Sequence, residues 1–365
     1  MNMYVSSRLM GALALSLSLA PALPVQGAAR TIVTVASTVP SNGDVNPYGV
    51  AVVPESTGNL VQGHILVSNF NNSSNLQGTG TTIVDIAPNG QAGLFAWIDA
   101  STLPGNCPGG VGLTTALAVL RAGWVIVGSL PTTDGTSNTA QAGCLIVLNS
   151  TGTVVETFVS DLINGPWDMA ALDMGTTADL FVTNVLNGTV AAHGNVINQG
   201  TVVRIDLALT PAEMPSVVSM TTIGSGFPER TDPAALVIGP TGLGLSQDGT
   251  LYVADSLDNR IAMIENAASR TSSAGTGGNV TMGKYLNDPL GVAINPGNGN
   301  ILSVNGDNGL LVITTPGTGQ VAHRLLDASG TPPGNGALFG LAPAPEGLYF
   351  VDDATNTLNL LPNLP

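Results

Sequence analysis

A short phrase returns six times along this chain and limits its fold more than any other feature. Each copy has an apolar run, a turn rich in glycine or asparagine, and a second apolar run that ends in a polar residue; the clearest copy covers residues 240–261. Units of roughly 40–50 residues that contain several short strands are typical of β-propeller blades. The repeat therefore predicts an all-β protein.

Two landmarks define each unit. The first is the residue at which the inner strand begins, and its six copies are Gly49, Thr115, Asp168, Gly242, Gly291 and Gly340. The second is the polar residue that closes the next strand, and its copies are Asn69, Ser129, Asn184, Asp255, Asn305 and Asp352. Because one unit cannot bury both faces of its sheet, the units must stack against one another. We therefore predict a six-bladed β-propeller.

The two ends of the repeat support a closed ring. The sixth unit supplies only three strands, and residues 31–36 form a strand that belongs to no unit. We expect this N-terminal strand to complete the last blade, which leaves no open sheet edge. Charged residues make up only 9% of the chain, and the 46 glycines suit many short strands joined by tight turns. Residues 30–365 are thus expected to form a single propeller domain.

The first 29 residues have the pattern of a secretory signal peptide. Arg8 supplies the positive charge, residues 9–22 are apolar, and small residues follow at 27–29. The alternative is a membrane anchor, but an apolar run of about 14 residues is short for a bilayer, which needs about 20. We expect an exported protein, periplasmic or secreted, with no integral membrane span.

The charge balance is strongly acidic. The formal net charge is −15, and Lys284 is the one lysine that follows the expected signal peptide. Such a chain repels phosphate backbones, which argues against nucleic acid as a partner. The charge is otherwise explained by the solubility of an apolar-rich exported chain, which we expect to be a monomer.

The two cysteines, Cys107 and Cys144, are expected to form a disulfide because export favours oxidation. Cys107 lies in the loop before the inner strand of the second unit, and Cys144 ends the loop between its second and third strands. Strand direction alternates in a meander, so both loops lie on the same face. The alternative is a pair of buried thiols.

The residues beside the inner-strand starts predict the character of the channel mouth. These residues are Tyr48, Thr114, Trp167, Thr241, Leu290 and Phe339, and most are apolar or aromatic. Asp168 is the one carboxylate among the inner-strand landmarks. We predict that Tyr48, Trp167, Asp168, Thr241 and Phe339 bind a ligand. The alternative is that they plug the channel.

Long polar segments are expected on the same face as this mouth. They cover residues 71–80, 131–143 and 186–200, together with the segment 224–239 that leads into the fourth unit. Loops on a rigid scaffold often form ligand-binding sites. The alternative is that these loops are solvent-exposed insertions whose sequences have drifted, which would give the same polar composition. The first functional hypothesis is an exported, non-enzymatic propeller without a cofactor that binds a protein, peptide or glycan there.

One repeat carries a family resemblance. Residues 248–256, Asp-Gly-Thr-Leu-Tyr-Val-Ala-Asp-Ser, followed by Asn-Arg-Ile at 259–261, resemble the NHL repeat, and weaker copies occur at 300–305 and 347–352. With the diverged first three units, the resemblance covers nearly all of the chain after residue 29. It implies a propeller of the superfamily that also holds gluconolactonase-like and lyase members. It does not imply one activity.

The resemblance also implies a second functional hypothesis. Gluconolactonase-like relatives hold one divalent metal at the channel mouth through a Glu, an Asn and an Asp, and such oxygen ligands suit Ca²⁺ or Mg²⁺. Here Asp255 matches the Asp, whereas Thr241 stands at the Asn position and Asn46 at the Glu position. The alternative function is thus a divalent-metal-dependent, lactonase-like hydrolase or lyase. Otherwise Asp255 only accepts hydrogen bonds from the turn that follows it.

Overall fold

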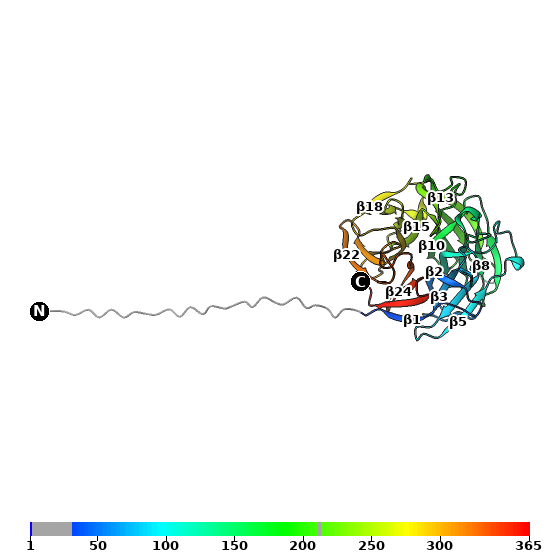
Figure 1. Ribbon diagram of the computed structural model, residues 1–365, viewed down its shortest axis with the longest axis horizontal. Coiled ribbons are helices and arrows are strands. Elements are labelled where there is room, and N and C mark those ends of the chain that lie inside the picture. Colours follow the sequence, from blue (N-terminus) through cyan, green and yellow to red (C-terminus); the bar gives the residue numbers. More distant parts are fainter. Residues whose placement is uncertain (2–30, 211–212) are drawn as a thin grey trace. The chain divides into compact units, whose positions relative to one another are not determined.

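The computed structural model describes residue 1, residues 31–210 and residues 213–365. The expected signal peptide lies outside the described residues. Residues 31–365 form one compact unit, in which six antiparallel sheets surround a central axis (Figure 1). This confirms the predicted all-β, six-bladed propeller. The described helices are three short 3-10 turns, and none is long and apolar enough to cross a membrane; they are η1 (Ala100–Thr102), η2 (Ser137–Thr139) and η3 (Ala267–Ser269).

The first two blades are four-stranded meanders that follow the chain from the inner to the outer strand. The strands of the first blade are β2 (Val45–Val52), β3 (Ile65–Asn71), β4 (Thr82–Ile86) and β5 (Ala92–Trp97). Those of the second blade are β6 (Leu113–Val119), β7 (Val125–Ser129), β8 (Cys144–Leu148) and β9 (Val154–Phe158).

The fourth and fifth blades repeat this plan. The strands of the fourth blade are β15 (Pro240–Leu245), β16 (Leu251–Asp255), β17 (Arg260–Ile264) and β18 (Gly278–Met282). Those of the fifth blade are β19 (Pro289–Ile294), β20 (Ile301–Asn305), β21 (Leu310–Thr315) and β22 (Gly319–Leu325).

The sixth blade closes the ring as the sequence predicts. Its strands are β23 (Leu338–Ala344), β24 (Gly347–Asp352), β25 (Thr357–Pro362) and the N-terminal β1 (Val33–Ser37). β1 pairs with β25 in antiparallel register, from Val33 opposite Leu360 to Ser37 opposite Thr357. Hydrogen bonds between the two ends of the described chain therefore hold the first and last blades together.

The third blade departs from the expected plan, because it has five strands. They are β10 (Pro166–Asp173), β11 (Thr177–Asn184), β12 (Ile197–Ala208), β13 (Ser216–Asp232) and β14 (Leu236–Ile238). The prediction of residues 224–239 as a loop is therefore wrong, because most of them form the hairpin of β13 and β14. The Asp232 carboxylate accepts hydrogen bonds from the backbone N–H groups of Ala234 and Ala235, which fixes the turn.

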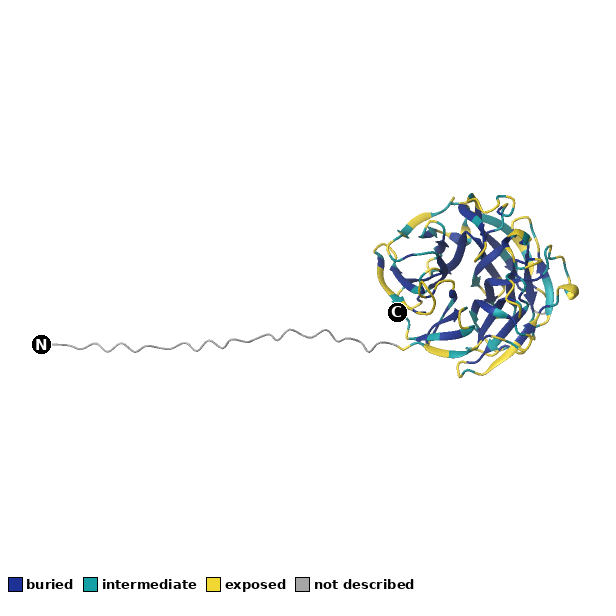
Figure 2. Cartoon of the chain, viewed as in Figure 1, coloured by how far each residue is buried: buried dark blue, intermediate teal, exposed yellow. Residues whose placement is uncertain are grey.

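The core lies between neighbouring blades and around the axis. Buried residues follow the inner and middle strands, and exposed residues gather in the outer strands and loops (Figure 2). Between the second and third blades, for example, Ile126, Val147, Leu180 and Val203 belong to one buried apolar cluster. Such alternate β-branched and leucine side chains bury each sheet face against the next blade.

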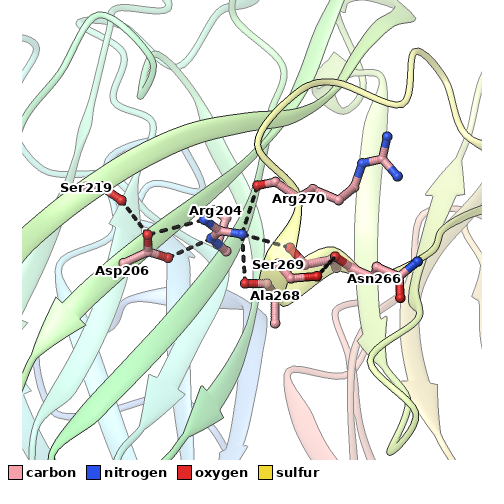
Figure 3. A network of polar contacts seen from close by, with 8 residues as sticks. Arg204, Asp206, Ser219, Asn266, Ala268, Ser269 and Arg270 are labelled. Carbon is pink, nitrogen blue, oxygen red and sulfur yellow. Dashed lines mark hydrogen bonds and ion pairs between the residues drawn. The ribbon is translucent and has the colours of Figure 1, made fainter.

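The seam between the third and fourth blades is also held by a buried cation. Arg204 on β12 forms an ion pair with Asp206, with 2.6 Å between Nε and Oδ1. Its Nη1 donates to three backbone carbonyls at η3, those of Ala267, Ala268 and Arg270 (Figure 3). The guanidinium thus ties a strand of one blade to a turn of the next.

Every inner strand has an irregular register at its start. The interruptions lie between Pro47 and Val50, Leu113 and Leu117, Pro166 and Met169, Pro240 and Leu243, Pro289 and Val292, and Leu338 and Leu341. A β-bulge bends its strand and re-aims the side chains that it contains. The six bulges contain the residues that the sequence placed at the channel mouth.

Candidate functional site

A cavity of about 450 Å³ opens at the start of the inner strands. Its walls come from the starts of β2, β19 and β23, from the turns after β16, β20 and β24, and from the β13–β14 hairpin. We call it the mouth cavity. Its apolar floor contains Tyr48, Leu290 and Phe339, and its polar wall contains Asn46, Arg230, Asp232, Asn259, Asn287, Asp288, Asp307, Asn335 and Asp353.

Aromatic rings build the floor. Tyr48 stacks on Phe339 with 3.9 Å between ring centroids and on Phe70 with 4.4 Å. Trp167 lies 6.5 Å from both Tyr48 and Phe339. The structure thus brings the three predicted aromatic residues together, but only Tyr48 and Phe339 line the mouth cavity. Trp167 lines a separate void of about 10 Å³ under Leu236 and Val237, the tip of the hairpin.

Asp288 is held in the wall by its own backbone. It has a φ of 54°, its N–H donates to Asn259 Oδ1 at 2.6 Å, and its carbonyl accepts from the Gly306 N–H at 2.7 Å. A Cβ on Gly306 would lie 2.7 Å from Asp288 Oδ2, so the glycine leaves the space that this carboxylate occupies. Burial raises the pKa of Asp288 to about 7, and the negative charges of Asp307 and Asp232 add to the shift.

Asn46 occupies the equivalent position in the first blade. It also has a positive φ, 62°, and its N–H donates to Asn356 Oδ1 at 2.7 Å. In the amide orientation that its neighbours require, Asn46 donates to Asp353 Oδ1 at 2.8 Å and accepts from Asn71 Nδ2. Burial raises the pKa of Asp353 to about 7, with a further contribution from Asp352. The mouth cavity therefore holds two carboxyl groups that change protonation near neutral pH.

The cavity has an acidic field. Among the described lining residues, Arg230 is the one cation, and its Nη1 is 2.7 Å from Asp232 Oδ2. The same lining carries four carboxyl groups, those of Asp232, Asp288, Asp307 and Asp353. One guanidinium cannot neutralise four acids, so the field disfavours anionic ligands and admits neutral or cationic ones.

Two predicted ligand-binding residues lie outside the mouth cavity. Asp168 lines a separate internal cavity of about 50 Å³, and its Oδ2 accepts from the Leu243 N–H at 2.8 Å. Thr241 is fully buried; its hydroxyl lies 2.7 Å from Ser256 Oγ and donates to the Pro289 carbonyl at 3.0 Å. Neither residue lines the mouth cavity, so their predicted ligand-binding role is not supported by a contact with it.

The three positions of the lactonase-like metal site do not converge. Asp255 is fully buried and forms an ion pair with Arg260, with 2.6 Å between Oδ2 and Nη2. Thr241 hydrogen-bonds to Ser256 and to the Pro289 carbonyl, and the Asn46 amide hydrogen-bonds to Asp353. Across residues 31–210 and 213–365, no cluster of three His, Cys, Asp or Glu side chains could hold a metal ion. The residues present do not fit the three-ligand site that the resemblance implies.

The remaining sequence predictions for this face have mixed outcomes. Cys107 and Cys144 form a disulfide with 5.3 Å between their Cα atoms, as predicted. Of the four long segments, only 224–239 contributes to the mouth cavity, and 71–80, 131–143 and 186–200 do not line it.

The sequence did not predict Asp288 or Asp353 as site residues, and it included Arg230 only as part of the segment 224–239. A signal for Asp288 was present, because Asn46 and Asp288 both precede a proline that opens an inner strand, Pro47 and Pro289. Asp353 directly follows the landmark residue Asp352, and no repeat position distinguishes it in the sequence. Arg230 lies on a strand that was expected to be a loop.

Comparison with known proteins places the fold. No protein-family model and no curated sequence matches this chain. A gluconolactonase from Xanthomonas campestris is 12% identical and superposes with a TM-score of 0.57 over 91% of this chain and 88% of that chain. A candidate gluconolactonase is 16% identical, with a TM-score of 0.55 over 92% and 93%. A streptogramin B lyase is 13% identical, with a TM-score of 0.52 over 90% and 96%.

These relatives correct the first functional hypothesis. The expectation of a non-enzymatic propeller that binds a protein, peptide or glycan is wrong on this comparison, because the similar structures are gluconolactonases and a lyase. The lactonase-like alternative is the better supported of the two. At identities of 12% to 16% the likeness establishes the fold. The structural neighbours of this chain are gluconolactonase-like six-bladed propellers.

Proposed function

We propose that this protein is a lactonase-like hydrolase of the NHL-type propeller superfamily that opens a small, neutral cyclic ester in the mouth cavity. One observation carries the proposal: Asp288 and Asp353, each with a pKa near 7, line one cavity of about 450 Å³. Carboxyl groups with raised pKa values in a cleft are common marks of acid–base chemistry.

The two carboxyl groups supply complementary proton transfers. Ionised Asp288 takes a proton from water, whose oxygen forms a bond to the ester carbonyl carbon. The ring C–O bond then breaks, and neutral Asp353 gives its proton to the leaving oxygen. The product is a hydroxy acid. Asn46, which donates to Asp353, holds this carboxyl in place. No step runs through a metal ion, because the residues present do not form the three-ligand site.

The lining supports a neutral, hydroxylated substrate. Cavities of this size enclose small molecules, and the side-chain amides of Asn259, Asn287 and Asn335 can bond hydroxyl groups. The stacked rings of Tyr48 and Phe339 offer a flat apolar floor to a sugar-like ring. Because the cavity is acidic, the carboxylate product would be repelled, which favours its release.

The direct test is proton release from a panel of neutral five- and six-membered lactones, followed with a pH indicator. We expect turnover above the spontaneous rate, with a bell-shaped pH profile centred near pH 7, because Asp288 must be ionised and Asp353 must be neutral. Asp288→Asn should lower kcat/KM by roughly 10²–10⁴-fold. Asp161→Asn is the matched control, because Asp161 is exposed and absent from the cavity lining. No turnover of any lactone would contradict the proposal.

Export and a monomeric state belong to the same proposal. The Cys107–Cys144 disulfide suits an oxidising compartment. A small-molecule substrate also requires no protein partner. Size-exclusion chromatography tests the monomeric state, and detection of the protein in the periplasmic or culture fraction of an expressing cell tests export.

A further inference from the structure

The β13–β14 hairpin brings a cation to the mouth cavity. Among the described sheets only the third blade has a fifth strand, so the hairpin is an addition to the repeated plan of the propeller. Arg230 on β13 pairs with Ile238 on β14, and both residues line the cavity. Because side chains two apart along a strand point to the same face, Asp232 lines the cavity beside Arg230. The hairpin therefore presents a guanidinium and a carboxylate to the cavity together.

The guanidinium of Arg230 is held in place without using all of its donors. Its Nη1 lies 2.7 Å from Asp232 Oδ2, and Asp232 Oδ1 accepts from the N–H groups of Ala234 and Ala235. The hairpin turn thus fixes the carboxylate, which in turn fixes the guanidinium. A guanidinium has five N–H donors, and across residues 31–210 and 213–365 the pair with Asp232 is the one polar contact that they make. Because 32% of its side chain is exposed, Arg230 can offer the remaining donors to a molecule in the cavity.

The charge of Arg230 acts on the carboxyl group that takes the proton in the proposed reaction. Burial raises the pKa of Asp288, and the negative charges of Asp307 and Asp232 raise it further. The positive charge of Arg230 opposes this rise. Charges shift a pKa in this way when they lie close to the titrating group. Arg230 is therefore near Asp288 and is also held by Asp232, so the three side chains form one cluster in the wall of the cavity.

The proposed reaction creates negative charge in an acidic cavity. When water attacks the ester, the carbonyl oxygen becomes an oxyanion, and four carboxyl groups line the same space. Preorganised hydrogen-bond donors stabilise such oxyanions in enzymes, and removal of one donor lowers kcat by about 10²–10³-fold. Arg230 is the one cation among the described lining residues, and a guanidinium stays charged near neutral pH. It is the lining group best suited to this task.

We propose that Arg230 is a catalytic residue whose guanidinium donates hydrogen bonds to the ester carbonyl oxygen and stabilises the oxyanion, a role that rests on the proposed function. As Asp288 takes a proton from water, the water oxygen bonds to the carbonyl carbon, and one electron pair of the C=O bond moves to the oxygen beside Arg230. When that pair returns, the ring C–O bond breaks and Asp353 protonates the leaving oxygen. Arg230 keeps its own protons throughout, and Asp232 acts as its positioning residue.

Turnover by Arg230→Ala, with and without added guanidinium chloride, tests this role. The variant should lose roughly 10²–10³-fold in kcat on a lactone that the wild type hydrolyses. Guanidinium at a non-denaturing concentration should restore part of this loss, and methylammonium should restore less, because it has the charge without the planar set of donors. Arg121→Ala is the matched control, since Arg121 does not line the cavity. A wild-type kcat in Arg230→Ala, or a loss that guanidinium leaves unchanged, would overturn the proposal.

A binding measurement separates this role from the proposed function. The probes are a six-membered cyclic phosphonate, whose anionic tetrahedral centre imitates the intermediate, and the neutral lactam of the same ring size. In isothermal titration calorimetry, Arg230→Ala should weaken phosphonate binding by at least about tenfold and lactam binding much less, and Arg121→Ala should change neither. If no lactone is hydrolysed but the phosphonate still requires Arg230, the proposed function fails and the anion-stabilising role stands. If lactones are hydrolysed but the phosphonate binds the wild type and Arg230→Ala equally, or binds neither, the role of Arg230 is overturned and the function stands.

Discussion

Buried charge is treated differently at the blade seam and at the channel mouth. At the seam, Arg204 meets the Asp206 carboxylate and three backbone carbonyls, so its donors are used within the fold (Figure 3). At the mouth, four carboxyl groups share the single guanidinium of Arg230. At the seam, the polar groups hold neighbouring blades together. At the mouth, only Asp232 forms an ion pair among the described lining carboxyl groups, so the other three can interact with water and ligand.

Glu229 tests most strongly how the fold treats a buried charge that has no partner. It is fully buried, and no ion pair involves it in the described structure. Its Oε1 accepts from the Asn187 N–H at 3.2 Å, and its Oε2 has no partner. Burial raises its pKa from 4.5 to about 8. The folded state therefore holds this proton more tightly than the unfolded state, and the associated stability is lost as pH rises through about 8.

Glu229→Gln should remove this pH dependence. The difference in unfolding free energy between the variant and the wild type should be small at pH 4 and should grow in favour of the variant to about 4–5 kcal/mol at pH 9. Urea unfolding at pH 4, 6, 7.5 and 9 measures it. Parallel stability curves for the two proteins would show that Glu229 does not titrate as its burial requires.

Arg204→Met tests the seam itself. Removing the buried guanidinium should cost about 3–5 kcal/mol, because three backbone carbonyls and the partly exposed Asp206 lose their donor. Arg121→Met is the matched control, because Arg121 pairs with Asp173 at the surface, and such pairs are worth about 0–1 kcal/mol. Equal losses in the two variants, measured by urea unfolding at pH 7, would contradict the role given to the seam.

Reduction of the Cys107–Cys144 disulfide should come next in size. The bridge spans 37 residues, and closing a loop of this length stabilises the fold by about 3–4 kcal/mol in the chain-entropy view. Cys107→Ala with Cys144→Ala should show the same loss without reductant. Lactone turnover at 20 °C should persist, since neither cysteine lines the mouth cavity. Loss of turnover in the folded double variant would argue against the location of the site.

The hairpin tip should have the smallest effect on stability. Leu236→Ala removes apolar atoms above Trp167 and should cost about 2–3 kcal/mol. It also enlarges the void of about 10 Å³ beneath the tip, which is separate from the mouth cavity, so the ratio of kcat/KM between bulky and small lactones should not change. A changed ratio would mean that the tip shapes the substrate site.

Periodic features of the sequence predicted the blades well. The landmark spacing gave six units, and the orphan N-terminal strand predicted the closure of β1 on β25. The cysteine pairing followed from export chemistry and alternating strand direction. Each of these features follows from the spacing of residues along the sequence, so it can be predicted without knowing which residues meet in the folded protein.

The candidate site could be predicted only in part. Tyr48 and Phe339 were found because aromatic residues at inner-strand starts must meet at the axis. Asp288 and Asp353 were missed because their importance comes from burial and from charges contributed by other blades. The hairpin of β13 and β14 was missed because its polar, glycine-containing sequence has the composition of a loop. Asp168 is the second residue of its bulge and lines an internal cavity instead of the mouth cavity. Only the three-dimensional structure shows this difference in depth.

A paired measurement on Asp288→Asn and Asp255→Asn tests the central claim most directly. Lactone kcat/KM and the free energy of unfolding are measured for both variants at pH 7.5. We predict that Asp288→Asn loses at least about 100-fold in kcat/KM with no loss of stability. Asp255→Asn should lose about 3 kcal/mol of stability, because it breaks the buried pair with Arg260, while its folded fraction keeps its activity. Full activity in Asp288→Asn, or an inactive but stable Asp255→Asn, would contradict the account.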